Sequence, residues 1–573
     1  MYDIGVDDEI WDVEPIADPS GVKDDGYIAV GSADMGITGK DICIMRLNPD
    51  GSKYTVGVWG ITNPIIVDAQ ASADVAYQVE QTTDGFLIIC GSTATDHFNP
   101  MGNKNNNAWV GKLKLDGTWA SGWNSGLYPG KEYGGTGNDI GYDIKQDNFG
   151  DYVIAGTANI GNFDVPPMVH VDGDYWVFKI PPNGNLNPAY SKVYSGDADA
   201  VGLDYARSLV IDCYTNYYVV SGFCTSCNSQ PSINSQLLLV KIKPDFTTFT
   251  SEHYGNINAQ FTWDYGSFNV IQTHDGTFNS CAGINDGFLS LGIQHPEFFY
   301  GCWGGTHDFW AVKTLNNIAN PNLSFTYQCV NANVGGSYGG RKNDKGFSSA
   351  LTCGGYLLAG ITESNKPAQP GCPSCEVSCN HYDCPPDVSS EDIWLVKIDP
   401  ITNQFIWNES IGKIGNDGAY TIKRVYDGSY IVAGYTTNNF EKDFYFRKFE
   451  LAQPCVAPGG LSILTAAVCA KVSWTVEPCV WKYKLEYQED NGPWIAIDGA
   501  ISPFTITDNT VAGTGYFKWR VTSYCSPNKF TTIYGSPFSI SYCNGCTCPL
   551  RVGNESDASE YGNNFLSVYP NPS

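Results

Sequence analysis

The chain of 573 residues is long enough for more than one hydrophobic core, and it is strongly acidic. Its 33 Lys and Arg against 60 Asp and Glu give a formal net charge of −27, which disfavours nucleic acid and anionic membrane surfaces as partners. No stretch is long and apolar enough to span a membrane. The 62 Gly, the 13% aromatic content and only 5 Met favour short strands and tight turns over helices. We therefore expect an all-β protein.

The cysteine content points to the compartment. A chain with 20 cysteines is expected to carry disulfides and to work outside the cytosol, with structural zinc as the alternative. Met1 is not followed by a basic and then apolar leader, so we expect any signal peptide to have been removed or to lie outside this sequence.

One sequence pattern is repeated seven times in the first three quarters of the chain. Each copy has an Asp that opens a strand, a second strand that ends in a small residue and Gly, and a third strand that ends in a basic residue. The opening residues are Asp8, Asp74, Asp139, Asp204, Asp264, Asp344 and Asp417. The glycines are Gly31, Gly91, Gly156, Gly222, Gly283, Gly360 and Gly434. The basic residues are Arg46, Lys112, Lys179, Lys241, Lys313, Lys397 and Lys448.

A fourth extended segment, such as 187–196 or 403–412, separates successive copies. Four-stranded units repeated radially are the blades of a propeller, so we predict a seven-bladed β-propeller of four-stranded antiparallel blades over 1–454. A parallel β-helix or a row of sandwiches is the alternative. The last copy lacks its own fourth strand, and we expect residues 1–5 to lie beside the strand of Lys448 and close the ring.

The repeated residues are expected to be structural. An Asp in the same place of every blade is predicted to cap a turn or to accept backbone N–H groups, with a bound cation such as calcium as the alternative. The basic residues are predicted to pair with a neighbouring blade, and the glycines to permit a bend or close packing. No cofactor is expected.

The loops between second and third strands all lie on the face that carries the opening Asp residues. The intervals from Gly283 to Lys313 and from Gly360 to Lys397 are the longest, which predicts insertions in the fifth and sixth blades at this face. The fifth insertion contributes the candidate ligand or partner site, formed by His295, Phe298, Phe299, Tyr300, Trp303 and His307. The alternative is that these rings only hold the loop together. The histidines have no metal-ligand spacing.

Two cysteine groups lie in these loops. Cys372, Cys375, Cys379 and Cys384 in the sixth blade are expected to form disulfides, with a zinc site as the alternative. Cys224 and Cys227 form a lone CxxC that is also expected to be oxidised, without a redox role. No nucleophile, metalloprotease or phosphate-loop motif is present, so we expect no enzyme, although paired carboxylates on a propeller can hydrolyse glycosides.

The segment 455–545 has the alternation of a small β-sandwich. Trp474 and Tyr516 resemble the core tryptophan and the tyrosine corner of fibronectin type III domains, which implies such a domain here. Cys525 and Cys543, near the ends of consecutive late strands, make a plausible disulfide. Residues 546–563 have the composition of a polar linker.

The chain ends NFLSVYPNPS at 564–573, which resembles the start of the C-terminal sorting domain (type A) of Bacteroidota type IX secretion substrates. The resemblance implies export by that machinery to the cell surface or the medium. The predicted function is that of a secreted, cell-surface-associated, non-catalytic binding or adhesion protein for a surface glycan or protein. One alternative is a structural subunit of a surface layer or filament that contacts copies of itself. Another is an extracellular polysaccharide-active enzyme.

Overall fold

The computed structural model describes residues 2–541, with gaps. The segments it does not describe are 18–23, 37–38, 68–72, 96–104, 125–128, 168–172, 196–201, 226, 228–234, 255–264, 274–286, 295–307, 317–324, 328–335, 339–342, 353, 364–390, 400–404, 413–414, 426, 439–440, 452–456, 467–468, 476–479, 481, 499, 501–503, 508–513, 527–528 and 542–573.

The described part of the chain is all-β and contains no α-helix, only the short 3-10 turns η1 (Gly57–Gly60) and η2 (Pro188–Tyr190). No described helix is long and apolar enough to cross a membrane. The described strands form nine antiparallel sheets, seven of them before residue 450.

The first three sheets each have four strands. They are β1 (Asp8–Ala17), β2 (Asp24–Asp34), β3 (Lys40–Leu47) and β4 (Ile65–Val67); β5 (Val75–Gln81), β6 (Phe86–Thr95), β7 (Asn105–Lys114) and β8 (Lys131–Tyr133); and β9 (Ile140–Gln146), β10 (Tyr152–Ala158), β11 (Asp174–Ile180) and β12 (Ser191–Tyr194).

The fourth to seventh sheets continue the series with four, five, four and three strands. They are β13 (Asp204–Ile211), β14 (Tyr218–Cys224), β15 (Gln236–Ile242) and β16 (Phe249–Tyr254); β17 (Tyr265–Thr273), β18 (Gly287–Gln294), β19 (Asp308–Asn316), β20 (Phe325–Tyr327) and β21 (Gly336–Tyr338); β22 (Asp344–Thr352), β23 (Gly355–Thr362), β24 (Asp392–Ile398) and β25 (Phe405–Ile411); and β26 (Asp417–Arg424), β27 (Tyr430–Asn438) and β28 (Glu441–Phe449).

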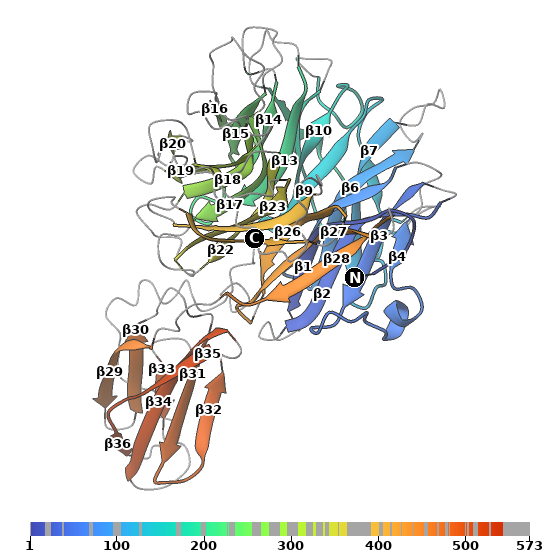
Figure 1. The fold of residues 1–573 in the computed structure, drawn as a ribbon. Coiled ribbons are helices and arrows are strands. Elements are labelled where there is room, and N and C mark those ends of the chain that lie inside the picture. Colours follow the sequence, from blue (N-terminus) through green and yellow to red (C-terminus); the bar gives the residue numbers. More distant parts are fainter. Residues whose placement is uncertain are drawn as a thin grey trace, which may run out of the picture.

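The first strands of these seven sheets contact one another in cyclic order. β1 touches β5, β5 touches β9, and the series continues through β13, β17 and β22 to β26, which touches β1 again. Figure 1 shows the result, with the orange strands of the seventh sheet beside the blue strands of the first. The first strands therefore surround a common axis, and we call them the axial strands.

Each interface between neighbouring sheets is a hydrophobic core of its own. Val110 of the second sheet packs with Ile154 of the third, and Ile431 of the seventh packs with Ala29 of the first. A strand between two such interfaces is buried on both faces, as Asp174–Ile180 is throughout. This explains why the repeats contain apolar runs as well as alternating patterns.

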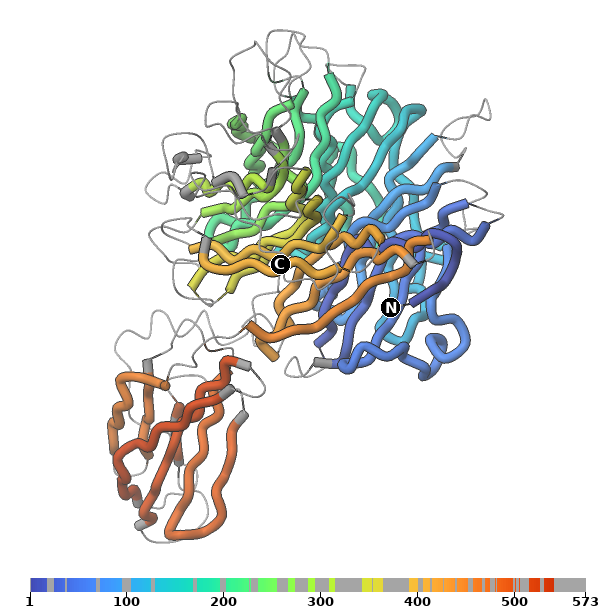
Figure 2. The backbone as a smooth tube through the Cα atoms, in the orientation of Figure 1, coloured from blue at the N-terminus to red at the C-terminus, as the bar shows by residue number. Residues whose placement is uncertain are grey.

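The chain closes on itself at Tyr2. Tyr2 and Phe444 exchange two backbone hydrogen bonds of 3.1 Å, so the N-terminal segment pairs with β28, the strand that contains Lys448 (Figure 2). The predicted closure is confirmed at this residue. Next to it, the Lys442 ammonium pairs with the carboxylate of Glu9, which joins the seventh sheet to the first.

The repeated glycine lies where two backbones nearly touch. A Cβ atom on Gly156 would lie 1.8 Å from the carbonyl oxygen of Ile140 on the neighbouring strand. The same contact, at 1.8 to 2.0 Å, recurs at Gly31, Gly91, Gly222, Gly292, Gly360 and Gly434. In the fifth sheet the residue in this register is Gly292, so the assignment of Gly283 was wrong; Gly283 lies outside the described residues.

With Gly292 in this register, the loop lengths of the fifth sheet differ from those predicted. The connection from β18 to β19 is 295–307, similar in length to 159–173 in the third sheet, and the extra residues of the fifth sheet lie in 274–286, between its first two strands. The prediction of an unusually long second-to-third loop is therefore wrong for the fifth sheet. It holds for the sixth, where 363–391 separates β23 from β24.

The repeated basic residue joins consecutive sheets. Lys179 Nζ lies 3.7 Å from Asp147 in its own sheet and 3.5 Å from the Tyr218 hydroxyl of the next. At the seam, Lys448 Nζ lies 2.6 Å from Asp427 and donates to the Tyr27 hydroxyl of the first sheet at 2.9 Å. These bonds add polar links to the apolar interfaces between sheets.

The last two sheets share a core of their own. They are β29 (Gly459–Ala466), β30 (Cys469–Thr475) and β33 (Phe504–Thr507), and β31 (Lys482–Glu489), β32 (Trp494–Asp498), β34 (Thr514–Ser526), β35 (Lys529–Tyr534) and β36 (Phe538–Ser541). Trp474 lies in that core with Trp519. Tyr516 is 43% exposed, so its assignment as a tyrosine corner was wrong; Phe517, one residue later, points inward.

Candidate functional site

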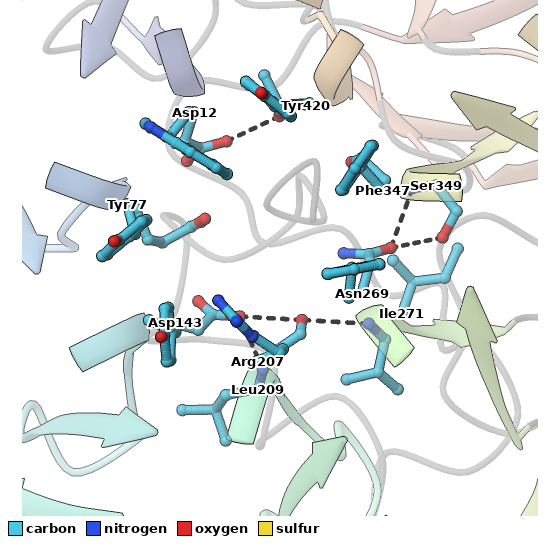
Figure 3. Close-up of a pocket in the computed structure, with 18 of the residues that line it drawn as sticks. Asp12, Tyr77, Asp143, Arg207, Leu209, Asn269, Ile271, Phe347, Ser349 and Tyr420 are labelled. Carbon is cyan, nitrogen blue, oxygen red and sulfur yellow. Dashed lines mark hydrogen bonds between the residues drawn. The ribbon is translucent and has the colours of Figure 1, made fainter. Parts of the chain in front are cut away.

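Every axial strand contains a β-bulge at the same place. The register shifts directly after the residue that faces the repeat glycine, and one extra residue is left in the axial strand. The seven extra residues are Trp11, Tyr77, Tyr142, Arg207, Phe268, Phe347 and Tyr420. Bulges redirect side chains next to functional sites in many β proteins. Here they direct six aromatic side chains and one arginine towards the axis (Figure 3).

These seven side chains form a closed ring of contacts, which we call the axial ring. Trp11 stacks on Tyr420 with ring centroids 4.2 Å apart and planes inclined by 6°. The Arg207 guanidinium lies 3.9 Å above the centre of Tyr142 and 6.0 Å from Phe268. The remaining neighbours, with centroids between 4.7 and 5.3 Å apart, are Trp11 and Tyr77, Tyr77 and Tyr142, Phe268 and Phe347, and Phe347 and Tyr420.

A polar belt follows the axial ring, one position further along each strand. Its members are Asp12, Gln78, Asp143, Ser208, Asn269, Ser348 and Thr421. Asp143 accepts from the backbone N–H of Leu209 at 2.7 Å, and Ser208 accepts from that of Val270 at 3.1 Å, so these bonds join the third sheet to the fourth and the fourth to the fifth. Asp12 closes the belt because it accepts from the Thr421 hydroxyl at 2.8 Å.

Two positions after the belt residue, the axial strands of the first three sheets and of the seventh carry charged side chains. Lys145 Nζ lies 3.3 Å from Glu80 and 3.8 Å from Asp143 Oδ1. Lys423 Nζ lies 3.5 Å from Asp12 and 3.9 Å from Glu14. The Lys145 side chain is 13% exposed, and the other five side chains are more than nine-tenths buried. The corresponding positions of the fourth to sixth sheets are apolar, namely Val210, Ile271 and Ala350.

Glu14 is the least compensated member of this group. Among the described residues its Oε1 atom accepts no hydrogen bond, and Lys423 is its only cation within 4 Å. Burial, together with the neighbouring carboxylates Glu80 and Asp12, raises the pKa of Glu14 from 4.5 to about 8 against the opposing effect of Lys423 and Lys145. Glu14 is therefore mainly protonated at neutral pH.

This pKa makes stability depend on pH. The unfolded chain loses the Glu14 proton near pH 4.5, whereas the folded protein holds it to about pH 8, so the stabilisation is complete at low pH and is lost as the pH rises through this window. Glu14→Gln is expected to flatten the decline of unfolding free energy with pH, by up to about 1.4 kcal/mol per pH unit. Thermal melts from pH 4.5 to 8 test this, with exposed Glu441→Gln as control. Parallel profiles for wild type and Glu14→Gln would contradict it.

The aromatic and histidine site predicted from sequence cannot be compared with the structure. His295, Phe298, Phe299, Tyr300, Trp303 and His307 lie outside the described residues, as do Cys372, Cys375, Cys379, Cys384, Cys543 and Asp264. The axial ring is a different set of residues.

Other sequence-predicted residues lie within the described part. Cys224 and Cys227 form a disulfide, and Cys525 is disulfide-bonded. The opening Asp residues of six sheets, Asp8, Asp74, Asp139, Asp204, Asp344 and Asp417, are buried. Four of them accept backbone N–H groups, as Asp139 does from Gly135 at 2.6 Å and Asp204 from Thr225 at 2.9 Å. Among the described residues no three His, Cys, Asp or Glu side chains are grouped as metal ligands.

Sequence reasoning missed the axial ring, although its signal is in the repeat. The residue three positions after the opening Asp is Trp11, Tyr77 and Tyr142 in the first three copies. An aromatic residue recurring at one repeat position, on the strand nearest the axis, is a sign that a side chain faces the axis.

No family model matches the chain, and no curated protein matches it. Among solved structures, a glucose dehydrogenase has 10% identity and a TM-score of 0.34, covering 78% of this chain and 98% of that one. The C-terminal domain of Pseudomonas aeruginosa PilY1 has 13% identity and a TM-score of 0.24, covering 79% of each chain. A two-domain fibronectin type III segment of chicken tenascin has 14% identity and a TM-score of 0.14, covering 26% of this chain and 91% of that one. All three scores are low, and none bears on function.

Proposed function

We propose that this chain is a secreted, non-catalytic binding protein, in which a seven-bladed β-propeller presents a ligand site at one end of its axis and a fibronectin type III-like sandwich acts as a spacer. The observation that carries the proposal is the axial ring, which places six aromatic side chains and one arginine, one from each sheet, around a single cavity. Surface-accessible aromatic groups held on a rigid scaffold are typical of recognition sites.

Disulfides support the extracellular location. Cys213, Cys224, Cys227, Cys469 and Cys525 are disulfide-bonded, whereas the described cysteines Cys43 and Cys90 are buried free thiols. Persistent disulfides are characteristic of oxidising compartments. Together with the C-terminal resemblance, they favour export by the type IX machinery to the cell surface.

The buried carboxylates support binding over catalysis. Glu80 and Glu14 each lie within 4 Å of a lysine ammonium, at 3.3 and 3.9 Å, and both are almost completely buried. A general acid and a general base must reach the bond that they cleave. Glu80 belongs to a buried ion pair and Glu14 is buried mainly as the neutral acid, so both have a structural role.

The ligand face is proposed to be the one that carries the starts of the axial strands. Each member of the axial ring is the third or fourth residue of its axial strand, and β23 ends on the same side, where Thr362 pairs with Asp344. The opposite face carries the turns that follow the axial strands, including Phe149, which is 69% exposed.

Binding to outer-surface material from the producing cells tests the proposal. Deletion of 296–304, in the connection between β18 and β19, is expected to abolish binding of the purified protein, measured by co-sedimentation, while Phe149→Ser on the opposite face leaves it unchanged. Far-UV circular dichroism checks that both variants fold. The proposal fails if the deletion variant binds like wild type or if Phe149→Ser alone abolishes binding. A wild-type protein that sediments only with copies of itself would support the surface-layer alternative.

A further inference from the structure

The cavity inside the axial ring has two chemically different walls. It encloses about 100 Å³. Asp12, Asp143, Lys145 and Lys423 supply charge from the first, third and seventh sheets, and Arg207 supplies it from the fourth. Leu209 and Ile271, from the fourth and fifth sheets, are apolar (Figure 3). A ligand that fits both walls must have polar and apolar surfaces.

Three buried hydrogen-bonding atoms of the residues that line this cavity are unused. Trp11 Nε1 and Arg207 Nε are donors, and Asp143 Oδ1 is an acceptor; none of the three has a hydrogen-bond partner among the described residues. The side chain of Asp143 is more than nine-tenths buried, and its Oδ1 atom is 3.8 Å from the nearest ammonium, that of Lys145. Buried polar atoms without partners are rare in folded proteins, so their convergence on one cavity indicates a ligand.

The mixture of donors and acceptors restricts the ligand's chemistry. A cation satisfies Asp143 but leaves the indole and guanidinium N–H groups unpaired. An anion satisfies those donors, and Lys145 and Lys423 attract it, but it has no hydrogen to donate to Asp143 Oδ1. A hydroxyl group both donates and accepts, so it satisfies all three atoms.

The axial ring adds the apolar requirement. Six of its seven side chains are only half-buried, and Tyr142 is 8% exposed, so ring edges and faces remain accessible. The C–H faces of a sugar pack against aromatic rings while its hydroxyls form hydrogen bonds. The volume of about 100 Å³ admits the end of one sugar ring, with the remainder over the ligand face.

We propose that the axial ring and its cavity bind the terminal sugar of an uncharged glycan. This inference rests on the proposed binding function and assigns its ligand class. Trp11 Nε1 and Asp143 Oδ1 hold hydroxyl groups, and the aromatic members of the ring cover the apolar face of the sugar.

Calorimetric titration of the full chain with a panel of methyl glycosides tests the inference, with choline and sulfate as cationic and anionic comparison probes. We expect at least one glycoside to bind, and neither comparison probe. Trp11→Phe keeps an aromatic ring but removes the Nε1 donor, and is expected to weaken glycoside binding about ten-fold, the loss expected for one neutral hydrogen bond. The matched control Trp407→Phe, on the outer strand β25, is expected to bind like wild type.

Three outcomes overturn the inference: binding of choline or sulfate in place of glycosides, glycoside binding that Trp11→Phe leaves unchanged, or no binding of any glycoside up to the solubility limit. Thermal melts of the two tryptophan variants exclude unfolding as the cause of a loss. If deletion of 296–304 abolishes binding to cell-surface material while Trp11→Phe does not, the proposed function stands and the sugar site is wrong.

Discussion

Lys241→Met is expected to lower the free energy of unfolding by about 3–5 kcal/mol, because it removes one partner of a buried ion pair. Lys241 Nζ lies 3.2 Å from Asp212 Oδ2, and the two side chains are 2% and 0% exposed. Burial lowers the pKa of Lys241, which Asp212 opposes. Methionine fills a similar volume but leaves the Asp212 carboxylate buried without its ammonium partner.

Denaturant unfolding followed by tryptophan fluorescence measures this loss. The control is Lys243→Met, two residues along the chain, where an ion pair of 3.5 Å with Asp245 is exposed and no measurable change is expected. Equal stability of the two variants would show that the buried pair contributes nothing to holding the fourth sheet.

Gly156→Ala is expected to destabilise the third sheet by about 3 kcal/mol or more, or to prevent folding. The added Cβ would lie 1.8 Å from the Ile140 carbonyl oxygen, so the two strands would have to separate at the bulge. Gly150→Ala is the matched control. It lies in the turn before the same strand, has φ +87° and nothing within 4 Å of the new Cβ, and is expected to cost only about 1–2 kcal/mol of backbone strain.

The same denaturation experiment separates the two causes. If both glycine variants lose the same stability, the conformation of the backbone and not the close approach explains the repeat glycine. Retention of wild-type stability by Gly156→Ala would show that the strands move apart at little cost.

The sequence predicts the all-β class and the series of antiparallel sheets well, because every copy of the repeat keeps its Asp, Gly and basic residue. The fifth copy is ambiguous in the sequence because 281–283 and 290–292 both end in glycine, and the former matches the small-residue pattern more closely. Only strand pairing identifies Gly292, since Ser267 lies opposite it as Ala206 lies opposite Gly222 in the fourth sheet.

The axial ring could not be predicted from the sequence pattern either, and the physical reason is different. A strand pattern of period two assigns alternate residues to opposite faces, but a bulge inserts one residue and changes the assignment from that point on. Trp11 therefore appears in the sequence as one more aromatic residue of a buried strand. Its contact with Tyr420, from the far end of the repeat series, depends on the sheets returning to their starting point.

The pairing of Tyr2 with Phe444 also has a mechanical consequence. The two segments are antiparallel, so the chain before Tyr2 and the chain after Phe449 leave this junction at the same end. Suppose that the chain before Tyr2 is anchored and the chain after Phe449 carries a load. Tension between them would break the two backbone hydrogen bonds of Tyr2 and Phe444 one after the other, which takes less force than breaking both at once by shear. A protein that holds a cell or a polymer under flow would thus begin to yield at this junction, at a force set by the side chains beside it, such as the Lys442–Glu9 pair.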